Sequence, residues 1–243
     1  MRNTKSGAFK TAMGVLTILL LSPAFNRPVN AQNAELQQRV AEIKQSAAKN
    51  KQALAQYTWI EQVTISLKGE QKKVEHFQAR LGPDGKTQKT SLDAPPAPPA
   101  EQGRRGRLKE KVVEKKKEEY KEYADQMKAL AEQYVPPEGA LIQQANEKGG
   151  ITVGPAGAPN VLQLIISNYL KPQDSLTLVF DKAKKELLQV QIASYMDDPS
   201  DAMNLTVQFT PLPDGTSHIS SLVIDGVKKQ LKIVVQNSSY QHL

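Results

Sequence analysis

The chain has 243 residues, no cysteine and a formal net charge of +7. The lack of cysteine excludes disulfide-stapled domains, thiolate metal centres and a lipid attached to an N-terminal cysteine. The length suffices for one domain that buries a core of its own.

The first 31 residues are typical of a secretory signal peptide. Three basic residues, Arg2, Lys5 and Lys10, precede the ten mostly apolar residues 12–21, and Val29–Asn30–Ala31 offers a small-residue cleavage site. This apolar run is shorter than the roughly 20 residues that span a bilayer. We therefore expect cleavage near Ala31, a periplasmic or secreted product, and no stable membrane anchor afterwards.

Removal of this leader also changes the charge. The leader holds four basic and no acidic residues, so the formal charge falls from +7 to +3 without it. Part of the positive charge thus lies in the leader and serves export, and the sequence predicts no nucleic-acid partner.

Cleavage after Ala31 can be tested directly. Protein recovered outside the cytoplasm should begin at Gln32 on N-terminal sequencing. Recovery of an intact 1–31 segment in the membrane fraction would contradict this interpretation.

The mature chain begins with one helix and a meander of strands. Apolar residues from Leu36 to Leu54 recur at helical spacing and predict an amphipathic helix. Residues 57–67 then alternate with apolar side chains at odd positions, except at Glu61. Two further strands, 74–81 and 87–92, follow after turns too short for parallel connections.

The middle of the chain breaks this pattern. Residues 94–100 are rich in proline, Arg107–Tyr134 reads as a long charged helix with a thin apolar seam, and 149–157 is rich in glycine. We interpret residues 94–159 as a mobile insertion within a single domain, residues 32–243. The charged helix is the candidate contact for an envelope protein.

Residues 161–170 are apolar nearly all round and predict a buried helix, although their β-branched residues also permit a strand. Asp225–Gly226 predicts a two-residue hairpin. The predicted fold class is α+β, in which the N-terminal helix packs on a curved antiparallel sheet. The sheet has about eight strands when the two strands of this hairpin are counted. The alternating segments of the C-terminal region are 175–180, 186–196, 203–210, 217–224 and 227–236.

The sequence offers little catalytic chemistry. The three histidines, His76, His218 and His242, show no metal-ligand spacing and read as surface residues, and no nucleophile motif is present. Asp197–Asp201 is either a helix N-cap or a weak calcium loop, and Glu61 is either a tuned buried acid or a residue at a sheet edge. We expect a protein that is not an enzyme of a familiar hydrolase or metal-dependent class, with no cofactor and no metal site.

The order of elements resembles the periplasmic outer-membrane lipoprotein carrier family. The resemblance rests on Leu36 to Leu54 running into Tyr57–Ile65, followed by the strand Val74 to Leu81. It implies a curved antiparallel half-barrel that is closed by helices over an apolar cavity, and a lipid or acylated protein as ligand. No functional residue of that family transfers to this chain, since residues 94–148 are proline-rich and charged here.

The one-sided aliphatic face of the sheet is an independent reason to expect an apolar ligand. The protein would then be a soluble binding or carrier protein of the cell envelope. The alternative is a filled core with a structural or protein-interaction role for the charged helix. The candidate ligand contacts are Trp59, Val63, Ile65, Leu188, Val190 and Ile192.

Overall fold

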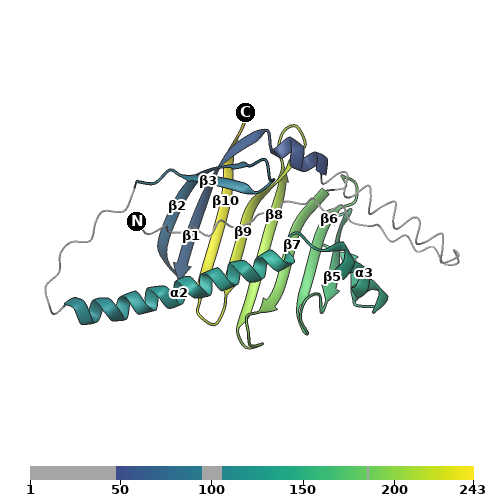
Figure 1. Cartoon of the computed structure of the whole chain (residues 1–243). Coiled ribbons are helices and arrows are strands. Elements are labelled where there is room, and N and C mark those ends of the chain that lie inside the picture. The colour runs from purple at the N-terminus through teal and green to yellow at the C-terminus, as the bar shows by residue number, and fades with distance from the viewer. Residues whose placement is uncertain (1–47, 95–105, 185) are drawn as a thin grey trace, which may run out of the picture.

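The computed structural model describes residues 48–94, 106–184 and 186–243, with side chains from residue 114 onward in the second range. Over these residues the chain forms an open sheet of ten antiparallel strands, with helix α2 lying across one face (Figure 1). The α+β class is therefore confirmed. The strands follow the order β3-β2-β1-β10-β9-β8-β7-β6-β5-β4, so β3 and β4 are the edges.

Two helices separate the first three strands from the last seven. These helices are α2 (Gly106–Tyr134) and α3 (Gly139–Glu147). The strands before them are β1 (Tyr57–Leu67), β2 (Glu70–Leu81) and β3 (Thr87–Ser91). The strands after them are β4 (Ile151–Pro155), β5 (Val161–Ser167), β6 (Ser175–Asp181), β7 (Glu186–Tyr195), β8 (Ala202–Pro211), β9 (Ser217–Gly226) and β10 (Leu231–His242).

The two blocks of strands join where β1 pairs with β10. Val63 lies opposite Val235 in this pairing, and Leu67 lies opposite Leu231. Because β1 also pairs with β2, the N-terminal meander continues the C-terminal sheet without a break.

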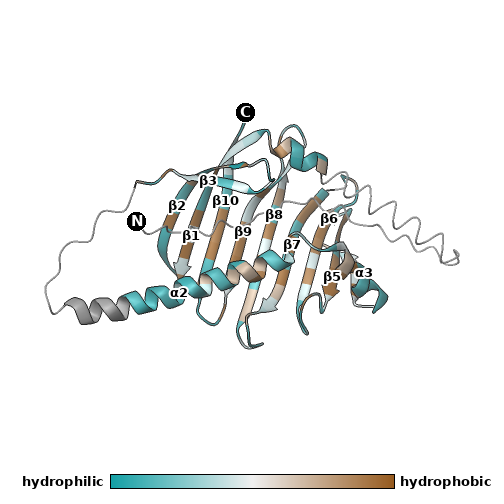
Figure 2. Ribbon diagram, viewed as in Figure 1, coloured by the Kyte–Doolittle hydropathy of each residue, from teal (hydrophilic) through white to brown (hydrophobic). Residues whose placement is uncertain are grey.

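The C-terminal half of α2 covers the core. Its buried residues recur at helical spacing, whereas side chains 114–119 are all exposed. Figure 2 shows the same division, with the helix hydrophilic before it reaches the sheet and more apolar over it. The buried α2 residues are Tyr123, Ala124, Met127, Leu130, Ala131 and Tyr134.

Part of the segment expected to be a mobile insertion, the C-terminal half of α2, therefore belongs to the core, whereas residues 95–105 lie outside the described residues. Met127 and Tyr134 are fully buried against the sheet, and β4 adds an edge strand that pairs with β5. The helix packs on the sheet because its narrow row of apolar residues meets an aliphatic face that would otherwise be exposed to water. None of the helices among the described residues is long and apolar enough to span a membrane.

The expectation of about eight strands is wrong, because β4 and β5 raise the number to ten in the described chain. The helix expected over residues 161–170 is strand β5, with Leu164 and Ile166 buried on alternate positions. A short apolar run suits either structure, and here the neighbouring strands β4 and β6 supply ladder hydrogen bonds on both sides.

The N-terminal helix is described only from residue 48, and it ends at Leu54. Most of the expected helix, residues 36–47, lies outside the described residues. Leu54 is buried against Trp59, Ala79 and Leu81 in a small second cluster. Within the described chain, the helix that crosses the main aliphatic face is α2.

The expected two-residue hairpin at Asp225–Gly226 is also wrong. Both residues belong to β9, Gly226 pairs with Leu231, and the turn is formed by residues 227–230. Gly226 serves another purpose, since a Cβ atom there would lie 2.7 Å from Tyr123 Cε1 and 2.8 Å from Met127 Sδ. The missing side chain lets α2 approach the end of β9.

We predict that Gly226→Ala destabilises the protein by about 1–3 kcal/mol, because two buried α2 side chains must move. Thermal or urea unfolding measures the loss. Gly154→Ala is the matched control, since a Cβ atom there meets nothing within 4 Å; its effect should stay within about 0.5 kcal/mol. Equal stability of the two variants would contradict close packing of α2 on β9.

Candidate functional site

An aliphatic strip runs along the joint between the two strand blocks. It consists of Val63, Ile65 and Leu67 of β1 and Val235 of β10, all partly buried and packed against the main core. Alternation places the three β1 residues on one face, and the register sets Val63 beside Val235. Unlike the core beneath α2, the strip remains partly accessible to solvent.

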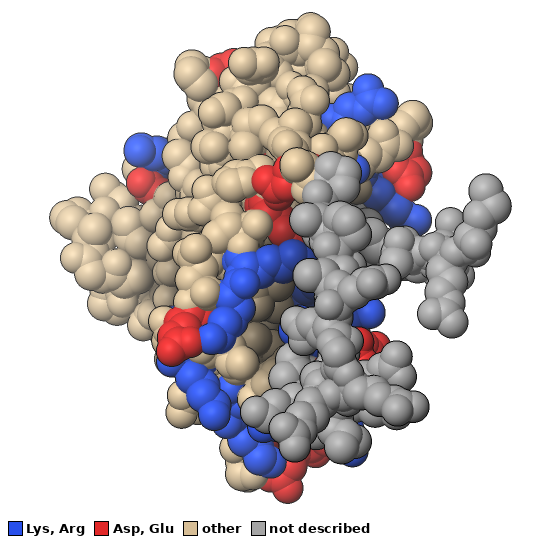
Figure 3. All heavy atoms as spheres, turned by 90° about the vertical axis from the view of Figure 1, so that its left-hand side faces the viewer, with Lys and Arg blue, Asp and Glu red and all other residues tan. Residues whose placement is uncertain are grey.

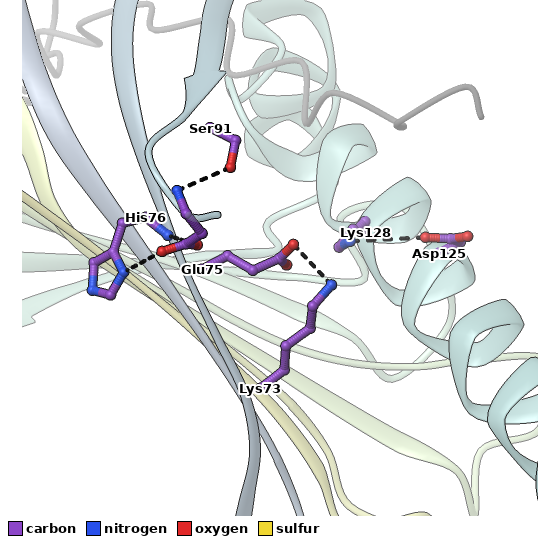
Figure 4. Close-up of polar contacts among 7 residues, drawn as sticks. Lys73, Glu75, His76, Ser91, Asp125 and Lys128 are labelled. Carbon is purple, nitrogen blue, oxygen red and sulfur yellow. Dashed lines mark hydrogen bonds and ion pairs between the residues drawn. The ribbon is translucent and has the colours of Figure 1, made fainter. Parts of the chain in front are cut away.

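Charged side chains border this strip on β2. Glu75 lies opposite Val63 and Lys73 opposite Ile65, and the two form an ion pair at 2.8 Å. Figure 4 shows both side chains extending from β2 toward the side where α2 carries Lys128 paired with Asp125. The strip thus has an apolar floor and a charged flank.

His76 points away from this flank in the same view (Figure 4). Its backbone N–H donates to Asp93 Oδ2 at 2.7 Å, and its Nδ1 lies 3.0 Å from Asp93 Oδ1. Asp93 thereby fastens the chain after β3 to β2. The side chains of His76 and His242 are exposed, as expected.

At one end the strip meets a polar cavity of about 420 Å³. Two turns line it, the β1–β2 turn at Lys68 and the β9–β10 turn at residues 228–230. Glu119 and Tyr120 of α2 complete it. Basic side chains gather on the side of the molecule that carries β2 and the beginning of α2 (Figure 3). We call this space the turn cavity; its lining residues are Lys68, Glu119, Tyr120, Lys228, Lys229 and Gln230.

At the other end of β1, Glu61 is only 4% exposed and forms an ion pair with Lys89 of β3. The Lys89 ammonium also lies 5.9 Å from the centre of the Phe77 ring. Glu61 is therefore buried and paired, on a strand inside the sheet and not at its edge. Lys89 could not be identified as its partner from the sequence, because Glu61, Phe77 and Lys89 lie on three different strands and meet only through the register of the sheet.

Next to this ion pair, aromatic rings stack around Tyr240. Trp59 stacks on Tyr240 with ring centres 5.5 Å apart, and His218 lies 4.1 Å from the same ring. Burial, and then the nearby Glu61 carboxylate, raise the pKa of the Tyr240 hydroxyl, which remains neutral at physiological pH. Within the described residues, Trp59 Nε1, His218 Nδ1 and Asn237 Oδ1 are buried without a hydrogen-bond partner.

The expectation that His218 is a surface residue is wrong, because it is only 6% exposed. Its ring lies 4.1 Å from the ring of Tyr240, which packs against the second cluster, so this end of β9 is covered and not open to water. Burial lowers the pKa of His218, and a backbone hydrogen bond with Ile219 opposes this shift only partly.

This burial predicts a pH-dependent stability. His218 in the unfolded chain takes up a proton near pH 6.5, whereas the folded chain resists it. The contribution of the neutral His218 ring to the free energy of unfolding is thus fully present above pH 6.5. It is lost as the pH falls toward the lowered folded-state pKa, by at most about 1.4 kcal/mol per pH unit. Urea unfolding at pH 7.5 and 5.5 measures the effect.

His218→Phe should flatten this difference, since it removes the titrating ring. His242→Gln, at an exposed site, is the control and should keep the wild-type difference. An unchanged pH response in His218→Phe would refute the assignment.

The six candidate ligand contacts are not equivalent. Val190 and Ile192 are fully buried core residues, and Trp59 is 5% exposed beneath Leu54 and against Tyr240. Leu188 is half-buried on β7, away from β1 in the strand order. Only Val63 and Ile65 belong to the aliphatic strip, which Leu67 and Val235 extend. Periodicity identified the face but not the part that α2 leaves accessible.

A buried polar network anchors the end of α2. The Tyr134 hydroxyl donates to Asp174 Oδ2 at 2.6 Å and lies 2.7 Å from Ser194 Oγ. Burial, and then the bond to Asp174, raise the pKa of Tyr134. Backbone N–H groups of Tyr169, Leu170 and Lys171 donate to the same carboxylate. With its oxygens satisfied by these donors, Asp174 serves structure here.

The acidic cluster Asp197–Asp201 forms a turn between β7 and β8. The Ser200 side chain, and then its backbone N–H at 2.8 Å from Asp198 Oδ1, donate hydrogen bonds that lower the pKa of Asp198, and no helix begins there. The N-cap interpretation is therefore wrong. Among the described residues, no group of three or more acidic, histidine or cysteine side chains is placed to hold a metal ion.

Comparison with known proteins adds one distant likeness. No family model matches the sequence, and no characterised protein matches it significantly. Among solved structures, a DUF1329 family protein from Desulfovibrio piger ATCC 29098 is similar with a TM-score of 0.36 and 13% identity, over 80% of this chain and 89% of that chain. A likeness this distant indicates no function.

Proposed function

We propose that the protein is an exported, non-enzymatic binding or carrier protein of the cell envelope, which holds an acyl chain or another apolar group on the aliphatic strip. The observation that carries this proposal is the contrast along one sheet face. Under α2 the aliphatic side chains are fully buried, whereas Val63, Ile65, Leu67 and Val235 keep partly exposed surface.

The apolar surface of the strip favours contact with an apolar group, since each 100 Å² removed from water stabilises a complex by roughly 2.5 kcal/mol. Its charged flank at Lys73 and Glu75 disfavours a broad protein interface centred on the strip, because interface cores are depleted of charged residues. A narrow apolar floor with charged borders suits a chain-like ligand.

The element order that resembles lipoprotein carriers supports the same proposal. An open antiparallel sheet with helices on one face is compatible with that resemblance. The ligand site proposed here lies at the β1–β10 joint, on the strip that β1 and β10 share, and not over the core strand β7, where Val190 and Ile192 are already covered.

Native mass spectrometry of gently purified protein, followed by lipid extraction, tests the proposal. Wild-type protein should carry bound lipid, and Ile65→Asp should lower retention at least about tenfold, because a carboxylate would lie against the acyl chain. Thr64→Asp is the matched control, since neighbouring strand residues point to opposite faces. The control should retain lipid.

A fluorescent fatty-acid analogue supplies a second measurement through its displacement by unlabelled lipid. Trp59 itself is a poor reporter, because it is already buried and stacked on Tyr240. Absence of lipid on the wild-type protein together with no displacement at several acyl lengths would contradict the proposal.

One observation favours a second candidate function, a protein-interaction role for α2. Side chains 114–119 project into solvent beyond the part of the helix that packs on the sheet. Lys115→Glu with Lys117→Glu should then abolish crosslinking to an envelope partner while the fold is kept. Deletion of the helix cannot test this function, because it removes Met127 and Tyr134 from the core.

A further inference from the structure

The turn cavity is built from three separate segments held together by specific contacts. The Lys68 N–H donates to the Gln230 carbonyl at 2.8 Å, which fixes the β1–β2 turn beside the β9–β10 turn. Both residues have left-handed backbones, with φ of 55° and 51°. The Lys229 ammonium lies 4.5 Å from the centre of the Tyr123 ring of α2, so the helix is tied to the same turn.

The charges that line the turn cavity are mainly positive. Lys68, Lys228 and Lys229 face one lining carboxylate, Glu119. None of these lysines is within ion-pair distance of a carboxylate among the described residues. The cavity therefore concentrates cationic groups that no ion pair with a described carboxylate neutralises.

Other carboxylates near these turns have partners of their own. Asp225 lies 3.7 Å from Lys232, and Asp201 accepts the Tyr123 hydroxyl at 2.6 Å. Asp198, which Lys228 influences electrostatically, accepts the Ser200 N–H. These contacts leave the three lining lysines available to an anion from outside.

The turn cavity lies beside the end of the aliphatic strip. Leu67, the last strip residue on β1, directly precedes Lys68, and its partner Leu231 directly follows Gln230. Among the described residues, no aliphatic side chain lines the cavity itself. An apolar chain on the strip would thus end where the cationic lining begins.

We infer that the turn cavity binds the phosphate head group of an acyl lipid whose chain lies on the strip, an inference that rests on the proposed function. Lysine ammonium groups bind phosphate as point charges with several donors each. A volume of about 420 Å³ exceeds the need of a bare carboxylate and accommodates a phosphate head group. The ligand class is therefore an anionic acyl phospholipid.

Binding of lysophosphatidic acid and lysophosphatidylcholine with the same acyl chain tests this inference at low ionic strength. The wild-type protein should bind the anionic lipid at least about tenfold more tightly, as expected for two or three ion pairs. Lys68→Gln with Lys228→Gln should abolish this preference, because it weakens lysophosphatidic acid binding much more than lysophosphatidylcholine binding. Lys229 is retained because it packs on Tyr123.

Lys182→Gln with Lys184→Gln is the matched control, since it removes the same charge from exposed sites in the β6–β7 turn. This variant should keep the wild-type preference. Equal binding of both lipids by the wild-type protein, or a preference that survives Lys68→Gln with Lys228→Gln, overturns the head-group site and leaves the proposed function standing.

Two further results are decisive. Inorganic phosphate that binds as tightly as lysophosphatidic acid would show a free-anion site and overturn the lipid assignment. If neither lipid binds the wild-type protein, the proposed function fails, and the head-group inference fails with it.

Discussion

The docking of α2 on the sheet is the contact on which the rest of the structure depends. Ten antiparallel strands present an aliphatic face that water would otherwise reach, and the C-terminal half of α2 covers its centre. Tyr134 fixes the end of the helix through its bond to Asp174, and Gly226 permits close approach at the end of β9. Loss of the buried Tyr134 hydroxyl would leave one acceptor of Asp174 less satisfied, a change of about 1–3 kcal/mol.

Sequence periodicity predicted the strands whose apolar and polar residues alternate. It failed where the secondary structure depends on neighbouring strands or helices. β6 to β10 follow from alternation, because one face is buried and the other is solvated. β5 is apolar on both faces, so only its pairing with β4 and β6 distinguishes it from a helix. Gly226 looked like a turn residue, but its role depends on a helix about a hundred residues earlier in the chain.

The aliphatic character of the candidate site could be predicted from the sequence, but its position on the sheet could not. Alternation on β1 correctly placed Val63 and Ile65 on an aliphatic face, but it could not show that α2 covers Val190 and Ile192. The turn cavity could not be predicted from the sequence, since Lys68 and Lys228 are far apart along the chain. The charge run of residues 228–229 was visible, but charge runs usually mark solvated turns. Glu61 and Lys89 likewise meet only through the register of β1, β2 and β3.

Both functions proposed for this protein would involve α2. Its C-terminal half is fixed in the core, while Glu119 and Tyr120 form one wall of the turn cavity and residues 114–119 extend into solvent. A partner that binds the extended half would act on a helix that also borders the head-group site. Because α2 is buried from Tyr123 onward, only a shift of the exposed part that carries Glu119 and Tyr120 with it would alter the cavity wall. Ligand binding and partner binding would then be coupled, each favouring or opposing the other by the same free energy.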